Sequence, residues 1–134
     1  MSQENMEIVI GQFENVNARD FAAVMDTWAE DVSLVIHADL GPMETTAIGK
    51  EAVGEWFGDW FRQFAPDYRF EIEETRGSGD RVFVLAAHHG RGRGSGAPVT
   101  QRTAYVYTLR EGKVRRGEVW ADRETALEAA GLGE

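Results

Sequence analysis

The sequence predicts a single α+β domain in which helices come first and a β-sheet follows. In the first half of the 134-residue chain, apolar residues recur every three or four positions, which is typical of helices that bury one face. In the second half, β-branched and aromatic residues gather in four stretches separated by turn residues, which is typical of antiparallel strands. With 43% apolar residues, the chain can bury one core over residues 1–134 without a disulfide or a metal.

Three helices are expected before the main sheet. Apolar residues between positions 6 and 16 share one face of the first helix. Asn17 is expected to cap a second helix, whose apolar stripe runs over residues 21–28. The third helix covers about residues 49–64 and ends before Pro66. Its apolar residues give the clearest helical period in the chain: Val53, Trp56, Phe57, Trp60, Phe61 and Phe64.

The strands are predicted from alternation and from turn residues. A short strand is expected at 32–36, followed by an irregular segment at 38–48 with Gly41-Pro42 as a turn. Short turns join the later strands into an antiparallel meander, and a short helix over 122–130 then ends at Gly131. We expect the helices to pack into the concave face of the sheet and to leave an apolar pocket at its open end. The four later strands are expected at 68–76, 81–90, 99–110 and 113–120.

The composition excludes several kinds of site and partner. The chain has no cysteine, which excludes disulfides, thiolate metal sites and a cysteine nucleophile. A net charge of −9 argues against a nucleic-acid partner, and no apolar run approaches the ~20 residues of a membrane span. The first residues are polar and unlike a signal peptide, so a cytoplasmic protein is expected. Residues 1–75 hold 16 acidic and 4 basic residues and residues 76–134 hold 7 and 10, which indicates acidic helices and an arginine-bearing sheet.

Six short stretches, spread over nearly the whole chain, resemble a known family. They lie at residues 17–21, 28–32, 48–53, 95–99, 109–114 and 126–132. In these stretches the sequence is similar to SnoaL-like domains of the nuclear transport factor 2-like superfamily, which also includes ketosteroid isomerases and polyketide cyclases. The resemblance implies a cone-shaped α+β barrel, with three N-terminal helices packed in a curved antiparallel sheet and a short C-terminal helix. It also implies a homodimer formed through the sheet.

Asp122 is the leading candidate for catalysis. It follows the last predicted strand, where the resemblance to SnoaL-like cyclases implies an acid/base aspartate. A carboxylate in an apolar pocket has a raised pKa, which suits proton transfer near neutral pH. The alternative is that Asp122 caps the C-terminal helix, since it is followed by Arg123, Glu124 and Thr125. The two roles are compatible.

His37 and Arg102 are the candidates to assist Asp122. His37 ends the first strand, near the place of the general base in ketosteroid isomerases, and its imidazole can titrate near neutral pH. Its alternative is a histidine at the edge of a loop. Arg102, with Asp122 or Glu118, can imitate part of the Asp–Arg–Asp arrangement of limonene epoxide hydrolase, a relative by fold. Its alternative is an ion pair with a carboxylate of the sheet.

Aromatic residues and one histidine are the candidates for contact with a ligand. Neighbouring strand residues point to opposite faces, so His88 and His89 do not make a metal pair and no metal site is expected. One of the two faces the pocket, and His88 is the candidate. The run at 91–96 predicts a hairpin tip, with a weak anion-binding surface as the alternative. The tryptophans expected at the pocket are Trp28, Trp56, Trp60 and Trp120.

Two functions of different classes fit these observations. The first is an enzyme that needs no cofactor and isomerises, cyclises or hydrates a small, apolar or aromatic molecule through a pocket carboxylate. The second is a ligand-binding or dimerisation module without chemistry. The first requires Asp122 and another polar group to face one enclosed cavity, so the position of Asp122 distinguishes the two.

Overall fold

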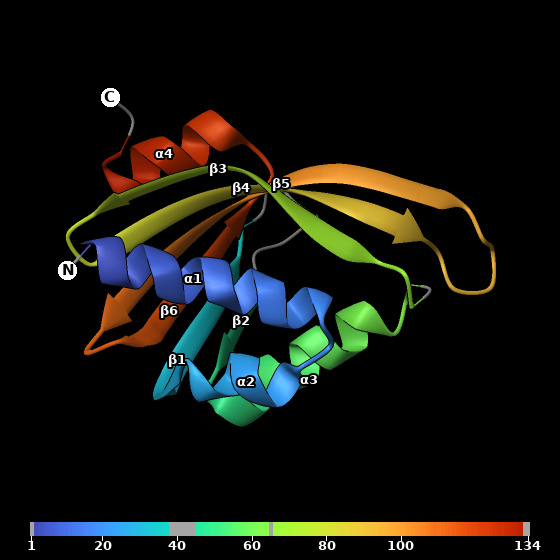
Figure 1. Cartoon of the computed structure of the whole chain (residues 1–134), viewed down its shortest axis with the longest axis horizontal. Coiled ribbons are helices and arrows are strands. Elements are labelled where there is room, and N and C mark those ends of the chain that lie inside the picture. The colour runs from blue at the N-terminus through green and yellow to red at the C-terminus, as the bar shows by residue number, and fades with distance from the viewer. Residues whose placement is uncertain (1, 38–44, 65, 133–134) are drawn as a thin grey trace.

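The computed structural model describes residues 2–37, 45–64 and 66–132 (Figure 1). The predicted order of helices and strands is confirmed, and the segment that includes the predicted Gly41-Pro42 turn lies outside the described residues. Residues 45–48 form a short strand in a stretch predicted to be irregular. The elements are α1 (Ser2–Asn17), α2 (Phe21–Asp26), β1 (Trp28–Ile36), β2 (Thr45–Ile48), α3 (Lys50–Phe61), β3 (Arg69–Ser78), β4 (Arg81–Arg91), β5 (Pro98–Arg110), β6 (Lys113–Trp120) and α4 (Arg123–Ala130).

The strands form one curved, open sheet in the order β2-β1-β6-β5-β4-β3. The last four strands make the predicted antiparallel meander. The sheet differs from the expected all-antiparallel one at a single pairing, because β1 runs parallel to β6, with Ser33 opposite Arg116 and Ile36 opposite Val119. The sequence pattern of a strand does not encode the direction of its neighbour, so it does not predict this parallel pairing.

The junction between α1 and α2 differs from the prediction in its capping residue. Asp20, rather than Asn17, caps α2: its Oδ1 accepts a hydrogen bond of 3.2 Å from the Ala23 amide. Asn17 is the last residue of α1, and its side chain pairs with the backbone of Phe70, donating to the carbonyl at 2.9 Å and accepting from the amide at 2.8 Å. Asn17 therefore joins α1 to β3. The second helix is shorter than predicted, because Trp28 already begins β1.

The helices lie on both faces of the sheet. Helix α1 packs against β3 and β4 on the concave face, and α3 packs against β1 and β2. Helix α4 lies on the other side of the sheet from α1, over β4, β5 and β6 (Figure 1). A small apolar cluster fills the space beneath it: Phe83, Ala104, Val106, Ala126, Leu127 and Ala130. In the part of the chain that the structure describes, no helix has the length and apolarity needed to cross a membrane.

Candidate functional site

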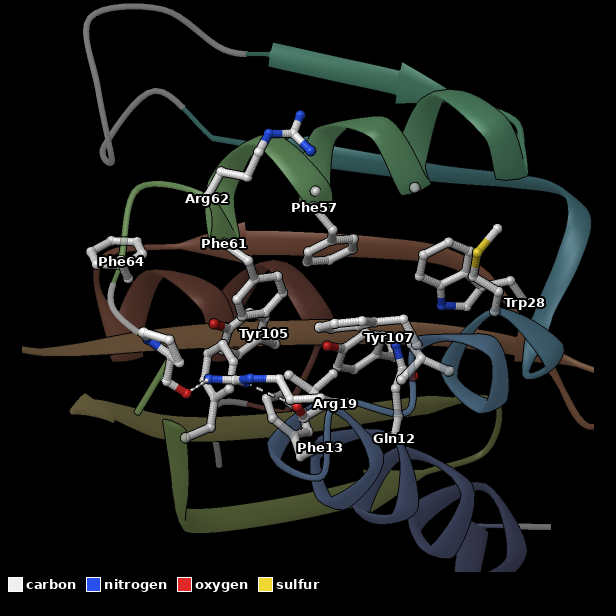
Figure 2. Close-up of a pocket in the computed structure, with 18 of the residues that line it drawn as sticks. Gln12, Phe13, Arg19, Trp28, Phe57, Phe61, Arg62, Phe64, Tyr105 and Tyr107 are labelled. Atoms are coloured by element: carbon white, nitrogen blue, oxygen red, sulfur yellow. Dashed lines mark hydrogen bonds between the residues drawn. The ribbon is translucent and has the colours of Figure 1, made fainter. Parts of the chain in front are cut away.

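A cavity of about 580 Å³ lies between the first three helices and the concave face of the sheet (Figure 2). Figure 2 shows Phe57 and Phe61 of α3 facing Tyr105 and Tyr107 of β5 across it. Its volume falls in the ordinary range for sites that hold small molecules. Its lining is mainly aromatic and aliphatic: Phe13, Val16, Phe21, Val24, Met25, Trp28, Phe57, Phe61, Phe64, Phe70, Tyr105 and Tyr107, with Gln12, Arg19, Gly54, Gly58, Arg62, Pro66 and Arg93.

Helix α3 builds one wall of the cavity from alternating aromatic residues and glycines. Gly54, Phe57, Gly58 and Phe61 are three or four residues apart, so all four lie on one face of the helix. The glycines add no side chain to this face, and Met25 packs close to one of them: a Cβ on Gly54 would contact the Met25 Cε at 3.5 Å. Phe57 in turn stacks on Trp28, with ring centroids 5.8 Å apart. The helical period found in the sequence thus gives one wall of the cavity.

Three uncharged polar side chains reach the cavity. Gln12 is only 5% exposed, and its Oε1 has no hydrogen-bond partner among the described residues. Tyr105 and Tyr107 are buried, and burial raises the pKa of each hydroxyl well above its ordinary value. Both hydroxyls therefore stay protonated at neutral pH and can donate a hydrogen bond to a ligand. Among the described residues that line the cavity there is no Asp, Glu or His.

A chain of hydrogen bonds leads from Trp60 to Tyr105, a residue of the cavity lining. The Trp60 Nε1 donates to the Tyr68 hydroxyl at 3.3 Å, and this hydroxyl contacts Nδ1 of His88. The Nε2 of His88 lies 3.0 Å from the hydroxyl of Tyr105, which lines the cavity. Burial lowers the pKa of His88 to about 4 and raises the pKa of Tyr68 to about 12, so both are neutral at pH 7. His88 faces the concave side as expected, but it supports Tyr105 rather than lining the cavity.

Three arginines belong to the cavity lining, Arg19, Arg62 and Arg93, which we call the arginine rim. Arg62 and Arg93 are exposed and Arg19 is half-buried. The Arg19 guanidinium donates to the carbonyl oxygens of Val16 and Pro66, at 3.1 and 2.8 Å, and to that of Tyr68. Figure 2 shows its side chain running beside the aromatic lining, and it lies 5.7 Å from the centre of the Phe61 ring. The Arg93 Nε donates to the Arg62 carbonyl at 3.0 Å.

The three predicted catalytic residues do not line this cavity. Asp122 is exposed and caps α4, accepting hydrogen bonds from the amide and the hydroxyl of Thr125 at 2.9 and 2.7 Å, and these bonds lower the pKa of its carboxyl. Arg102 is exposed and forms a two-bond ion pair with Glu73. The structure therefore places Asp122 in the capping role and Arg102 in the ion-pair role that were their alternatives.

His37 lies in a different cluster. Its ring stacks on Trp120 with centroids 3.4 Å apart, and its Nε2 lies 3.1 Å from a carboxylate oxygen of Glu118. Trp120 packs against the apolar cluster beneath α4, on the face of the sheet away from the cavity. The structure thus brings His37, Glu118 and Trp120 together, but apart from the cavity lining. In the residues that the structure describes, no three histidine or acidic side chains gather as metal ligands.

Of the four predicted tryptophans, Trp28 lines the cavity. Trp56 and Trp60 stack on each other with centroids 5.7 Å apart, and neither belongs to the cavity lining. Sequence analysis missed Gln12 as a lining residue, although a signal was present. Gln12 lies three residues after Val9 and four before Val16, which makes it a polar residue on the apolar face of α1.

Comparison with known proteins identifies the family. Residues 9–117 match the SnoaL-like domain. The chain belongs to this family. Its members include polyketide cyclases and isomerases, and the predicted resemblance is confirmed. No curated protein matches this SnoaL-like chain.

Solved structures with the same fold cover the SnoaL-like chain almost completely. An NTF2-like protein of unknown function from Burkholderia pseudomallei has 22% identity and a TM-score of 0.77, over 96% of this chain and 97% of that one. A SnoaL-like protein from Jannaschia sp. CCS1, suggested to be a polyketide cyclase, has 22% identity and a TM-score of 0.79, over 99% and 94%. A protein with a ketosteroid isomerase-like fold from Catenulispora acidiphila, solved with trimethylamine, has 21% identity and a TM-score of 0.74, over 94% and 93%. At these identities the similarity establishes the fold.

Proposed function

We propose that this SnoaL-like domain binds a small, largely apolar molecule in the cavity between its helices and its sheet. The observation that carries the proposal is the aromatic lining around about 580 Å³ of space. An apolar ligand that moves from water into a cavity lined by apolar rings removes its own surface and that of the rings from water, which favours binding. Gln12, Tyr105 and Tyr107 supply the few polar contacts that would orient a carbonyl or hydroxyl group.

Binding fits the lining better than acid/base catalysis by a carboxylate. The described lining holds no carboxylate and no imidazole, and its tyrosine hydroxyls hold their protons too tightly to act as bases near pH 7. Asp122, the predicted acid/base group, lies at the cap of α4 instead. We therefore assign ligand binding to the cavity and give Asp122 no part in it.

A neutral fluorescent probe, 1-pyrenebutanol, tests this proposal. Bound near Trp28, the pyrene group accepts excitation energy from tryptophan, so titration should quench tryptophan emission and reach saturation. Gly54→Leu adds a side chain to the cavity face of α3, and we expect it to weaken binding about tenfold or more, because the new side chain occupies the ligand's space.

Gly11→Leu is the matched control for this titration. Gly11 also lies in a helix, a Cβ there meets no described residue within 4 Å, and Gly11 does not belong to the cavity lining. We expect Gly11→Leu to bind the probe as the wild type does. Absence of saturable binding to the wild type, or equal binding by Gly54→Leu, would contradict the proposal.

A further inference from the structure

We propose that the ligand of the cavity is an organic anion, with its acidic group at the arginine rim and its apolar body inside. This inference rests on the proposed function and names the class of ligand. It joins two features of the same cavity: a mainly aromatic lining, and three arginines in that lining, Arg19, Arg62 and Arg93.

The arginine rim is basic, although the chain as a whole is acidic. The chain carries a net charge of −9, and its first 75 residues hold only 4 basic residues. Two of those four, Arg19 and Arg62, line the cavity together with Arg93, whereas no carboxylate does so among the described residues. A cationic opening on an acidic protein raises the local concentration of small anions and repels cations.

Two of the three rim arginines have no carboxylate partner among the described residues. Arg62 pairs with Asp59, but Arg19 and Arg93 donate to backbone carbonyl oxygens. Other surface arginines form ion pairs with carboxylates: Arg91 with Asp67, Arg102 with Glu73 and Arg110 with Asp31. The positive charge at the rim is therefore less neutralised than the charge on those arginines.

The unused donors of the rim suit an oxyanion. A guanidinium has five N–H donors, and the Nη groups of Arg93 make no hydrogen bond with the described residues. Arg19 uses three donors on carbonyl oxygens. The planar fork of a guanidinium matches a carboxylate, sulfonate or phosphate group with two parallel hydrogen bonds. One such group at the rim would leave an attached apolar body free to enter the cavity.

The backbone holds Arg93 beside α3. Gly92 pairs with Phe64 in an isolated β-bridge, and the Arg93 amide donates to the Gln63 carbonyl at 2.9 Å. The hairpin between β4 and β5 is thereby fixed to the chain that follows α3. The sequence predicts a weak anion-binding surface as the alternative role of this hairpin. We assign that role to Arg93, which belongs to the lining of the apolar cavity.

A matched pair of probes tests the inference. The probes 1-pyrenebutyrate and 1-pyrenebutanol share one apolar body and differ in charge. We expect the wild type to bind the acid about tenfold or more tightly than the alcohol, the ratio expected of a charge-assisted hydrogen bond. This preference should shrink between about 0.1 M and about 1 M NaCl, where the screening length falls from about 10 Å to about 3 Å.

Two arginine variants locate the effect. Arg93→Gln should weaken binding of the acid several-fold and leave binding of the alcohol unchanged. Arg102→Gln is the control, because it removes the same charge from an exposed arginine that lies outside the cavity lining. It should leave both affinities unchanged. Arg19 is unsuitable as a first variant because its bonds to three carbonyl oxygens also support the fold.

The outcomes separate this inference from the proposed function. If the alcohol binds as tightly as the acid, the inference fails while the apolar cavity remains a binding site. If Arg102→Gln weakens acid binding as much as Arg93→Gln, the net charge of the protein governs binding and the rim does not. If neither probe binds, the proposed function fails, and the inference fails with it.

Discussion

His88 is a buried side chain, 4% exposed, between the hydroxyls of Tyr68 and Tyr105. Trp60 can only donate, so the Tyr68 oxygen accepts from it and the Tyr68 hydrogen is directed at Nδ1 of His88. The hydrogen of the neutral imidazole is then on Nε2 and is donated to Tyr105. A donor-only indole thus fixes the tautomer of a histidine and orients a hydroxyl of the cavity wall.

The stability of the protein should therefore depend on pH through His88. Its pKa is about 4 in the folded chain and about 6.5 in an unfolded chain, so the unfolded state binds more protons between these values. The part of the unfolding free energy that depends on neutral His88 is fully present above pH 6.5. It is lost as the pH falls toward 4, and the loss amounts to about 3 kcal/mol. Urea denaturation at several pH values across this window measures the loss.

The neighbouring histidine supplies the control for that measurement. His88→Gln should flatten the dependence of the unfolding free energy on pH between 4 and 6.5. His89→Gln should keep most of it, because burial is the main cause of the lowered His88 pKa and the nearby charge of His89 is only the second cause. The same slope in His88→Gln as in the wild type would exclude His88 as its source.

Among the elements, α4 depends on its first and last residues. Asp122 caps its N-terminus, and Gly131 ends it in the left-handed conformation with a φ of 75°. Asp122→Ala should lower the melting temperature by about 3–5 °C, because it leaves amides of the first turn without an acceptor. Asp122→Asn should melt close to the wild type, because asparagine caps equally well. Thermal unfolding followed by circular dichroism checks both.

The two variants also separate capping from the predicted catalytic role of Asp122. Asparagine keeps the hydrogen-bond acceptor and removes the titrating carboxylate. Loss of a catalysed reaction in Asp122→Asn, at unchanged stability, would support that role. A melting temperature of Asp122→Asn as low as that of Asp122→Ala would contradict the capping explanation.

Local patterns predicted the elements well because they depend on neighbours in sequence. The period of α3 and the alternation in β6 follow from burial of one face, and β6 was predicted with its observed bounds. The helix caps were harder to predict. The Asn17 side chain hydrogen-bonds to the backbone of Phe70, 53 positions away, and not to the first turn of α2. The residues that come together at a site were the hardest to predict, because they are distant in sequence. The contact of His37 with Trp120 depends on the pairing of β1 with β6, which no local pattern predicts.

At the scale of the whole molecule, the homodimer through the sheet stays a prediction. Helix α4 already covers part of the convex face, and β3 to β5 also present ion pairs there, between Arg102 and Glu73 and between His89 and Glu71. An interface on this face would be polar, so we expect a dimer that weakens with salt. Light scattering at micromolar concentration should give twice the chain mass of 14.9 kDa. The mass of a single chain would contradict the prediction.

The position of β1 in the sheet has a consequence for biosynthesis. Strand β1 lies between β2 and β6, so one of its two neighbours is made only when the ribosome reaches Lys113–Trp120. Until then the aromatic face of α3 has no complete sheet to cover it. Such long-range pairing gives a high contact order and slow folding. A nascent chain that stops before β6 should remain a client of chaperones, and the cavity should come into being as one of the last events of synthesis.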